Sequence, residues 1–360
     1  MRLPKPNKTM AEKYVVGLSQ FKDKTAKIKL SANESALGPS PKAIKEYLKL
    51  SKNFKRYPDS GGVNLRKSLA NKFKLDPNRI ILGSGSDQIL ELVCKTFLKK
   101  GDEVVVPKYS FLIYRLYSQM NDAKILYSEE KNFTVSVDDI LKKVTKKTKI
   151  VFLANPNNPT STYIDKKKLL VLRKKLRSNI LLVVDDAYFE YVKQKNYSSG
   201  LQLFSNFKNV VVTRTFSKIY GLAGLRVGWG YGSKKIINSL NQFKPPFNIN
   251  SPALSAAEAA IQDNAWLNRE IKHVKKWNDK FYKEFKKLNI ETNKSFTNFL
   301  LINFDKIKKN SSKIFRLLAG AGILVRNMNN YGIKNSLRIT IGKNNENKKL
   351  ILKLKKVINV

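Results

Sequence analysis

Cysteine and histidine are almost absent from this chain, which has one of each among 360 residues. Cys94 has no second cysteine with which to form an internal disulfide. His273 is the one residue on which a Ser/His/Asp triad could be built, and a structural zinc site needs more cysteine and histidine than the chain contains. These absences exclude most triad and metal chemistry, and we expect no bound metal.

Long apolar runs are also missing. No segment reaches the roughly 18 consecutive apolar residues that a membrane span requires. The N-terminal sequence MRLPKPNKTMAEKY is basic and lacks the apolar stretch of a secretion signal. We therefore expect a cytoplasmic protein that does not associate with membranes.

Acidic residues are scarce: 27 Asp and Glu stand against 70 Lys and Arg, which gives a net charge of +43. Such a balance is typical of proteins that bind nucleic acids or anionic membranes. The lysines, however, are spread over nearly every predicted helix and form no single arm or stripe, and it is the patterning of charge that marks a binding face. We interpret the charge as a property of the solvated surface and expect no specific nucleic-acid partner.

Between Arg79 and Gly230, short apolar runs alternate with helical patterns. Runs such as 104–106 and 180–184 are continuously apolar, as in strands that are buried on both faces. The sequence therefore predicts an α/β fold with a mostly parallel sheet of seven strands between helices.

The pattern changes after Pro252 to a long amphipathic helix or helix pair. Strand candidates at 298–303, 323–326 and 337–341 follow, with a closing helix at 346–357. We expect an N-terminal arm (1–30), a large α/β domain (31–250) and a smaller α+β domain (251–360). The N-terminal segment is a candidate to complete the smaller domain.

Ligands of a doubly wound sheet bind beyond the carboxyl ends of its strands. One such end carries GSGSDQ (83–88), in which Ser86 or Asp87 can begin a helix whose first amides form an anion site. No Gly-Lys-Ser/Thr follows, so it is not a P-loop, and Gln88 replaces the third glycine of the dinucleotide motif. A plain strand-to-helix turn explains this segment equally well.

Two further strand ends carry polar residues. NPNNPTS (155–161) predicts a rigid, non-helical turn, and Asp185 and Asp186 follow a buried strand. A buried carboxylate is costly unless it is paired with a cation. Asp185 could alternatively cap the next helix.

The most informative segment is TRTFSKIYGLAGLRVGW (213–229). A lysine in an apolar, cation-rich pocket has a lowered pKa and becomes a nucleophile for carbonyl compounds, which Lys218 could be. Arg226, with Thr215 and Ser217, could hold a phosphate through charge-assisted hydrogen bonds. Taken alone, Lys218 would be read as a solvated side chain.

These motifs, together with DDAY and LRITIG, resemble in order and spacing the fold type I pyridoxal-phosphate aminotransferases. Four further segments are similar to the histidinol-phosphate aminotransferase family: LSANESALGPSPKA (30–43), RYPD (56–59), KPPFNINSPA (244–253) and GILVRNM (322–328). The resemblance extends from about Leu30 to Gly342. It implies pyridoxal 5'-phosphate as cofactor.

The resemblance also implies roles for individual residues. Lys218 would form the Schiff base with the cofactor and shuttle the proton, and Asp185 would pair with the pyridine nitrogen. Asn158 and Tyr188 would bind the ring's phenolic oxygen, and Phe111 would stack on the ring. The cofactor phosphate would be held by Ser86, Asp87, Thr215, Ser217 and Arg226, and by Tyr57 from the second subunit of a homodimer.

For the substrate, the resemblance implies that Arg338 receives a carboxylate or a phosphate, with Arg326 as a second cation and Asn33 nearby. The usual Asn-Glu-Asn-Pro is replaced by Asn-Glu-Ser-Ala at 33–36, and Ser161 replaces a glycine. The first change lies in the segment that faces the substrate, so substrate identity stays open while the cofactor assignment does not depend on it.

The leading hypothesis is an enzyme of histidine biosynthesis that converts L-histidinol phosphate and 2-oxoglutarate to imidazole-acetol phosphate and L-glutamate. An aromatic amino acid aminotransferase and a phosphothreonine decarboxylase of the same fold are alternatives. A basic nucleic-acid-binding protein would explain the charge but gives no role to Lys218, Asp185 or Asn158.

Overall fold

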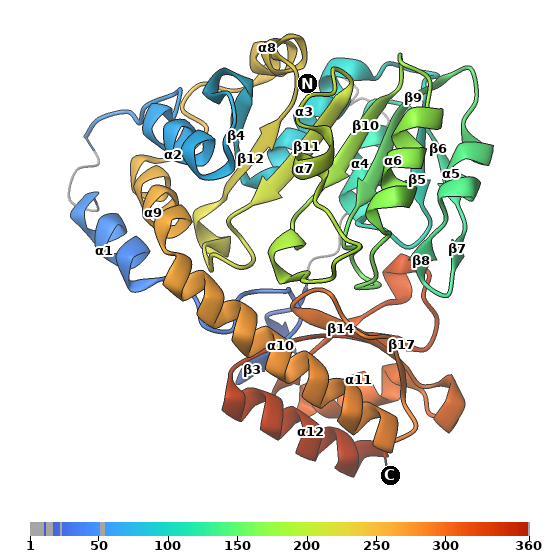
Figure 1. The fold of residues 1–360 in the computed structure, drawn as a ribbon. Helices are drawn as coiled ribbons and strands as arrows, with labels where there is room; N and C mark the ends of the chain where they lie inside the picture. Colours follow the sequence, from blue (N-terminus) through green and yellow to red (C-terminus); the bar gives the residue numbers. More distant parts are fainter. Residues whose placement is uncertain (1–10, 12–16, 22–23, 51–54, 359–360) are drawn as a thin grey trace, which may run out of the picture.

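A seven-stranded sheet forms the larger part of the protein in the computed structural model, which describes residues 11, 17–21, 24–50 and 55–358 (Figure 1). The strands run in the order β4-β12-β11-β10-β9-β5-β6. Only β12 is antiparallel to its neighbours, β11 and β4. The strands are β4 (Ile80–Ser84), β5 (Glu103–Pro107), β6 (Lys124–Ser128), β9 (Thr148–Ala154), β10 (Leu181–Asp185), β11 (Val210–Thr215) and β12 (Val227–Tyr231). The predicted mostly parallel α/β sheet is confirmed.

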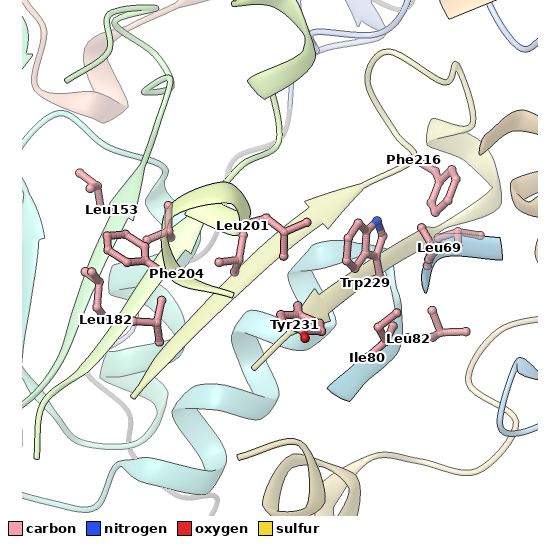
Figure 2. Close-up of a cluster of buried hydrophobic side chains, with 14 of the residues drawn as sticks. Leu69, Ile80, Leu82, Leu153, Leu182, Leu201, Phe204, Phe216, Trp229 and Tyr231 are labelled. Atoms are coloured by element: carbon pink, nitrogen blue, oxygen red, sulfur yellow. The ribbon is translucent and has the colours of Figure 1, made fainter. Parts of the chain in front are cut away.

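Helices cover both faces of this sheet because its strands are apolar on both sides. Along β10, Leu181 and Val183 face one core, whereas Leu182 and Val184 face the other. The first core contains α3 (Gly85–Phe97), α4 (Leu112–Met120) and α8 (Lys234–Phe243). The second contains α1 (Pro41–Leu50), α2 (Val63–Phe73), α5 (Val137–Lys143), α6 (Lys166–Lys175), α7 (Gly200–Phe204) and α9 (Ser251–Gln262). Figure 2 shows part of this second core, where Trp229 lies among Leu69, Leu82 and Phe216.

A smaller four-stranded antiparallel sheet lies below the large one in Figure 1. Its order is β13 (Glu291–Thr292), β14 (Phe299–Asn303), β17 (Ser336–Thr340) and β16 (Arg326–Asn327). It packs against α10 (Asn264–Lys287), α11 (Ser311–Gly320) and α12 (Asn344–Ile358). Helix α10 connects the large sheet to the small one. Ile271 packs on the second core of the large sheet, which we call the large core, and Trp277 and Phe281 belong to the core of the small sheet, which we call the small core.

The N-terminal segment joins the two parts. Strand β3 (Ile28–Lys29) pairs in parallel with β15 (Ile323–Leu324), and Ile28 and Leu30 lie in the small core. The chain then crosses to α1, which packs on the large core. Short hairpins are formed by β1 (Gln20–Phe21) with β2 (Lys24–Thr25) and by β7 (Glu130–Lys131) with β8 (Thr134–Val135).

The domain limits at residues 30 and 250 stay predictions. Helix α9 lies just after residue 250 and packs against the large sheet. Within the described part of the chain, no helix combines the length and hydrophobicity needed to cross a membrane.

Candidate active site

A cavity of about 460 Å³ opens between the carboxyl edge of the large sheet and the small sheet. Every predicted site residue except Tyr57 lines it: Asn33, Ser86, Asp87, Phe111, Asn158, Asp185, Tyr188, Thr215, Ser217, Lys218, Arg226, Arg326 and Arg338. The strand ends that the sequence singled out therefore meet in one place.

One end of the cavity is formed by the first turn of α3. Gly85 begins this helix directly after β4, with a φ of +76°. A Cβ atom on Gly85 would lie 2.4 Å from Nη2 of Arg226, and one on Gly228 would lie 2.2 Å from the backbone nitrogen of Ser86. Glycine at both positions lets the guanidinium and β12 approach the helix N-terminus, where free N–H groups favour an anion. This close packing places the guanidinium of Arg226 beside the first turn of α3.

The guanidinium of Arg226 lies at the same end of the cavity. Its backbone is left-handed, with a φ of 55°. Its Nη1 donates to Oγ of Ser217 at 3.2 Å and to the carbonyl of Ala223 at 2.9 Å, and its Nη2 lies 3.4 Å from Asp87. Hydroxyls, helix amides and a guanidinium thus converge, and this donor set fits a phosphate group.

Asp185 and Asp186 serve different parts of the structure. Asp185 lines the cavity and accepts a hydrogen bond of 2.8 Å from the hydroxyl of Tyr114. Burial raises the pKa of Asp185 to about 6, and the hydrogen bond from Tyr114 opposes this rise. Asp186 instead lies 3.4 Å from the buried guanidinium of Arg214 and accepts the first N–H group of α7, from Gly200. The buried cation partner therefore belongs to Asp186, and the N-cap of α7 is Ser199, whose hydroxyl accepts the N–H of Gln202.

Lys218 follows β11 and lines the cavity, where its Nζ donates to the carbonyl of Ala32 at 3.4 Å. Burial, followed by the positive charge of Arg338, lowers the pKa of Lys218 to about 8. A lysine with this pKa exists partly as the free amine near neutral pH, and the free amine is the nucleophile toward carbonyl groups.

Arg338 connects three segments of the chain. Its Nη1 donates to Oδ1 of Asn158 at 2.6 Å and its Nη2 to the carbonyl of Ser31 at 3.0 Å. Its Nε is buried and has no hydrogen-bond partner among the described residues. This unsatisfied guanidinium N–H on a residue that lines the cavity fits an anionic ligand. Arg326 lies opposite Arg338 in the register of β16 and β17.

Three more predicted residues occupy distinct places. Tyr188 is buried, and its hydroxyl accepts a hydrogen bond of 3.0 Å from Nδ2 of Asn33. Phe111 precedes α4 and packs edge-to-face on Tyr114. Tyr57 is 82% exposed and stacks on Phe247, outside the cavity. Its role in a second subunit stays a prediction.

Sequence reasoning missed Tyr114 as the partner of Asp185, although it follows Phe111 by one helical turn. It also missed the ion pair of Lys29 and Glu34, 2.8 Å apart at the cavity wall, and Tyr331 from the small part. Helical spacing could have indicated Tyr114. The others belong to segments far apart in the chain.

The fold and the site together define the class of protein as an aminotransferase. Residues 25–354 match the model of the family "Aminotransferase class I and II", whose cofactor is pyridoxal 5'-phosphate. The chain belongs to this family and, within it, to the histidinol-phosphate aminotransferases. It is 51% identical over 360 residues to the histidinol-phosphate aminotransferase of Pelagibacter ubique (strain HTCC1062), covering 100% of both chains. It is 41% identical over 359 residues to that of Rhodopseudomonas palustris (strain BisA53), covering 99% of this chain and 98% of the other.

Solved structures share the fold. The histidinol-phosphate aminotransferase of Sinorhizobium meliloti in complex with pyridoxal-5'-phosphate has a TM-score of 0.87 at 22% identity, covering 93% of this chain and 92% of that one. The histidinol-phosphate aminotransferase of Clostridium acetobutylicum has a TM-score of 0.84 at 25% identity, covering 92% and 98%. Aspartate aminotransferase from Thermus thermophilus with maleate has a TM-score of 0.82 at 18% identity, covering 91% and 90%. These likenesses confirm the expected fold type I architecture.

Proposed function

We propose that this enzyme converts L-histidinol phosphate and 2-oxoglutarate to imidazole-acetol phosphate and L-glutamate in histidine biosynthesis. The observation that carries the proposal is the pair of buried arginines, Arg326 and Arg338, which line one cavity from facing strand positions. A phosphate that is largely dianionic near neutral pH gains more from two guanidinium groups than a single carboxylate does. The full-length similarity to histidinol-phosphate aminotransferases supports the same substrate.

The cavity suits pyridoxal phosphate. Its phosphate would bind the first turn of α3 with Thr215, Ser217 and Arg226, and its ring nitrogen would face Asp185. Asn158 and Tyr188 would hydrogen-bond the ring oxygen, and Phe111 would cover the ring. When bound, the cofactor supplies an electron sink for the substrate carbon that loses its proton.

The side chains of the protein then divide the work. Lys218 has a lowered pKa, so its free amine would be available to hold the cofactor and, once the substrate amine has displaced it, to accept and return the proton of the substrate. The hydroxyl of Tyr114 stabilises the charged form of Asp185, which keeps a negative charge opposite the ring nitrogen. Arg338 and Arg326 hold the anionic group of the substrate, and Asn158 orients Arg338 from the other side.

The proposal includes a cytoplasmic homodimer in which Tyr57 reaches the cofactor phosphate of the neighbouring subunit. Its support is the exposure of the Tyr57 ring together with its stacking on Phe247, which places an aromatic pair on the surface. A second copy of the chain would cover such a pair.

A substrate panel tests the function. Purified holoenzyme is mixed with histidinol phosphate, phenylalanine or phosphothreonine, and conversion of the cofactor to its amine form is followed by absorbance. We expect the second-order rate constant of this conversion to be highest with histidinol phosphate. A higher value with phenylalanine would favour an aromatic aminotransferase, and release of carbon dioxide from phosphothreonine would favour the decarboxylase.

A further inference from the structure

Residues 31–33 contact three functional side chains of the cavity, two through backbone carbonyls and one through the side chain of Asn33. The carbonyl of Ser31 accepts from Arg338 at 3.0 Å, and the carbonyl of Ala32 accepts from Lys218 at 3.4 Å. The side chain of Asn33 donates to Tyr188 at 3.0 Å. The position of this short segment therefore affects the amine, the guanidinium and the phenol at once.

The small part of the protein holds the near end of this segment, residues 30–34, and the far end is the turn at residues 35–38. The backbone N–H of Leu30 donates to Leu324, and the N–H of Asn33 donates to Oγ1 of Thr340 at 2.9 Å. Asn298 donates to the carbonyls of Asn33 and Glu34. These contacts leave the residues that follow Glu34 to be fixed by a different element.

Glu270 on α10 fixes the far end. Its two carboxylate oxygens accept the backbone N–H groups of Ala36 and Leu37, each at 3.3 Å. The hydroxyl of Ser35 accepts the N–H of Gly38 at 3.1 Å within the same turn and also favours the charged form of the carboxylate. Glu270 has no exposed surface. Burial raises the pKa of Glu270 to about 7, whereas the bonds from Ser35, Leu37 and Ala36 lower it, so these donors favour the charged carboxylate.

The far end also touches the loop that carries Lys218. A Cβ atom on Gly221 would lie 2.2 Å from the carbonyl carbon of Gly38, so the two backbones are in direct contact. The N–H of Gly221 donates to the carbonyl of Lys218 at 3.0 Å. A shift of the turn at 35–38 would consequently reach Lys218 from two sides, through Ala32 and through Gly221.

We propose that Glu270 is a positioning residue, whose carboxylate holds the turn at 35–37 and thereby sets the placement of Lys218, Tyr188 and Arg338. The carboxylate does not line the cavity and touches none of these three side chains. Its effect passes through the backbone of residues 31–38, which connects α10 to the cavity wall. The kinetic part of the proposal rests on the aminotransferase activity proposed above.

The test is Glu270→Gln, which keeps the size of the side chain but replaces one acceptor oxygen with an NH₂ group that cannot accept an N–H. Glu284→Gln is the matched control, since Glu284 lies on the same helix and pairs with Lys355 at the surface. Hydrogen exchange is measured on the full-length chain without cofactor. We expect faster exchange in residues 31–38 of Glu270→Gln, with unchanged exchange in β9 and β10 and in the control.

The kinetic arm uses the holoenzyme. Loss of a hydrogen bond to a buried charge predicts that kcat falls about tenfold in Glu270→Gln, with a smaller change in KM. Ser35→Ala removes the hydroxyl that accepts the N–H of Gly38 in this turn, so it should lower kcat in the wild-type background. It should have little further effect in Glu270→Gln, because both variants loosen the same turn. Ser35→Ala also serves alone if Glu270→Gln does not fold.

Two results would overturn the proposal: wild-type kcat in both variants, or faster exchange spread over the whole protein with additive effects of the two substitutions. The hydrogen-exchange experiment contains no substrate. Its result therefore tests the role of Glu270 even if histidinol phosphate proves not to be the substrate.

Discussion

Arg326 and Arg338 lie directly opposite each other on the antiparallel strands β16 and β17, and both are more than nine-tenths buried. Side chains at opposite positions share one face of a sheet, so both guanidinium groups lie on the same side of β16 and β17. We expect the pair to favour a dianionic substrate group over a monoanionic one.

Arg326→Ala is expected to damage the half-reaction with histidinol phosphate more than the half-reaction with glutamate, by about tenfold or more for a lost charge-assisted bond. Arg338→Ala is expected to damage both, because either anion uses it. Single-turnover absorbance measurements with each substrate check this, with the exposed Arg316→Ala as control. Equal losses in both half-reactions of Arg326→Ala would remove its role in selecting phosphate.

Lys218→Met should abolish turnover and also make the cofactor-free protein more stable near pH 7. The pKa of Lys218 is about 8 in the folded protein, below the 10.5 of an ordinary lysine, so at pH 7 the folded state contains a charged amine that its surroundings disfavour. We expect the unfolding midpoint to rise by a few degrees at pH 7. The gain should vanish above about pH 10.5, where the amine is neutral in both states.

Thermal unfolding at the two pH values measures this difference, and the exposed Lys283→Met is the control. A variant with normal turnover would refute the assignment of Lys218. A variant with the same midpoint as the wild type at pH 7 would show that its amine is not disfavoured.

Tyr114→Phe should change the pH dependence of cofactor binding. In the wild type the pKa of Asp185 is about 6, so affinity for pyridoxal phosphate should fall as the pH drops below 6 and the carboxylate becomes neutral. Removing the Tyr114 hydroxyl removes a bond that lowers this pKa, so the midpoint should move to higher pH. Fluorescence titration of the cofactor-free protein across pH 5–8 is the measurement.

Two further variants serve as controls for this measurement. Asp185→Asn should bind the cofactor weakly and without this transition, and Tyr127→Phe, at a partly exposed position on β6, should behave like the wild type. An identical midpoint in Tyr114→Phe and wild type would mean that the hydroxyl does not stabilise the charge of Asp185.

The shared cavity proposed for the homodimer predicts recovery of activity from two defective chains. Lys218→Met lacks its own amine, and Tyr57→Ala lacks the group offered to the neighbouring subunit. A mixed dimer contains one cavity with both groups intact, so random exchange of subunits should restore about a quarter of the wild-type cavities. Activity is measured after mixing and re-equilibration, and a mixture no more active than its components would place Tyr57 in its own subunit.

The net charge of +43 should produce weak DNA binding that is lost as salt rises. Such binding releases counterions, so the logarithm of the affinity should fall linearly with the logarithm of salt concentration. Fluorescence anisotropy with two unrelated duplexes between low and physiological salt tests this expectation. Tight binding of one duplex at physiological salt would show that the charge has a specific partner.

The sequence predicted the sheet from local patterns, because continuous apolar runs marked the buried strands and polar residues directly after them marked the carboxyl edge. Other residues that line the cavity, among them Phe111, Arg326 and Arg338, were expected from the family resemblance alone. Strand alternation also implies that Asp185 and Asp186 face opposite sides. The pattern alone does not say which of them faces the cavity. The resemblance pointed to Asp185, which lines the cavity in the structure, whereas Asp186 pairs with Arg214.

Contacts between distant segments were not predictable. Glu270 and Ala36 are 234 positions apart, and no periodic pattern relates them. The unusual residues Ser35 and Ala36 left the identity of the substrate open. In the structure the backbone N–H of Ala36, which a proline at this position would lack, donates to Glu270, so the change affects the support of the segment.

The long separation between Ser31 and Arg338 also bears on how the enzyme is made. These residues are 307 positions apart, and they meet through the last strand of the small sheet. A nascent chain that has released the large sheet but not β17 cannot close the cavity, even though the strands carrying Asp185 and Lys218 are complete. The anion site of Arg338 is thus completed late in synthesis, after the strands that carry the groups proposed to hold the cofactor, and the carboxyl edge of the sheet stays open until then.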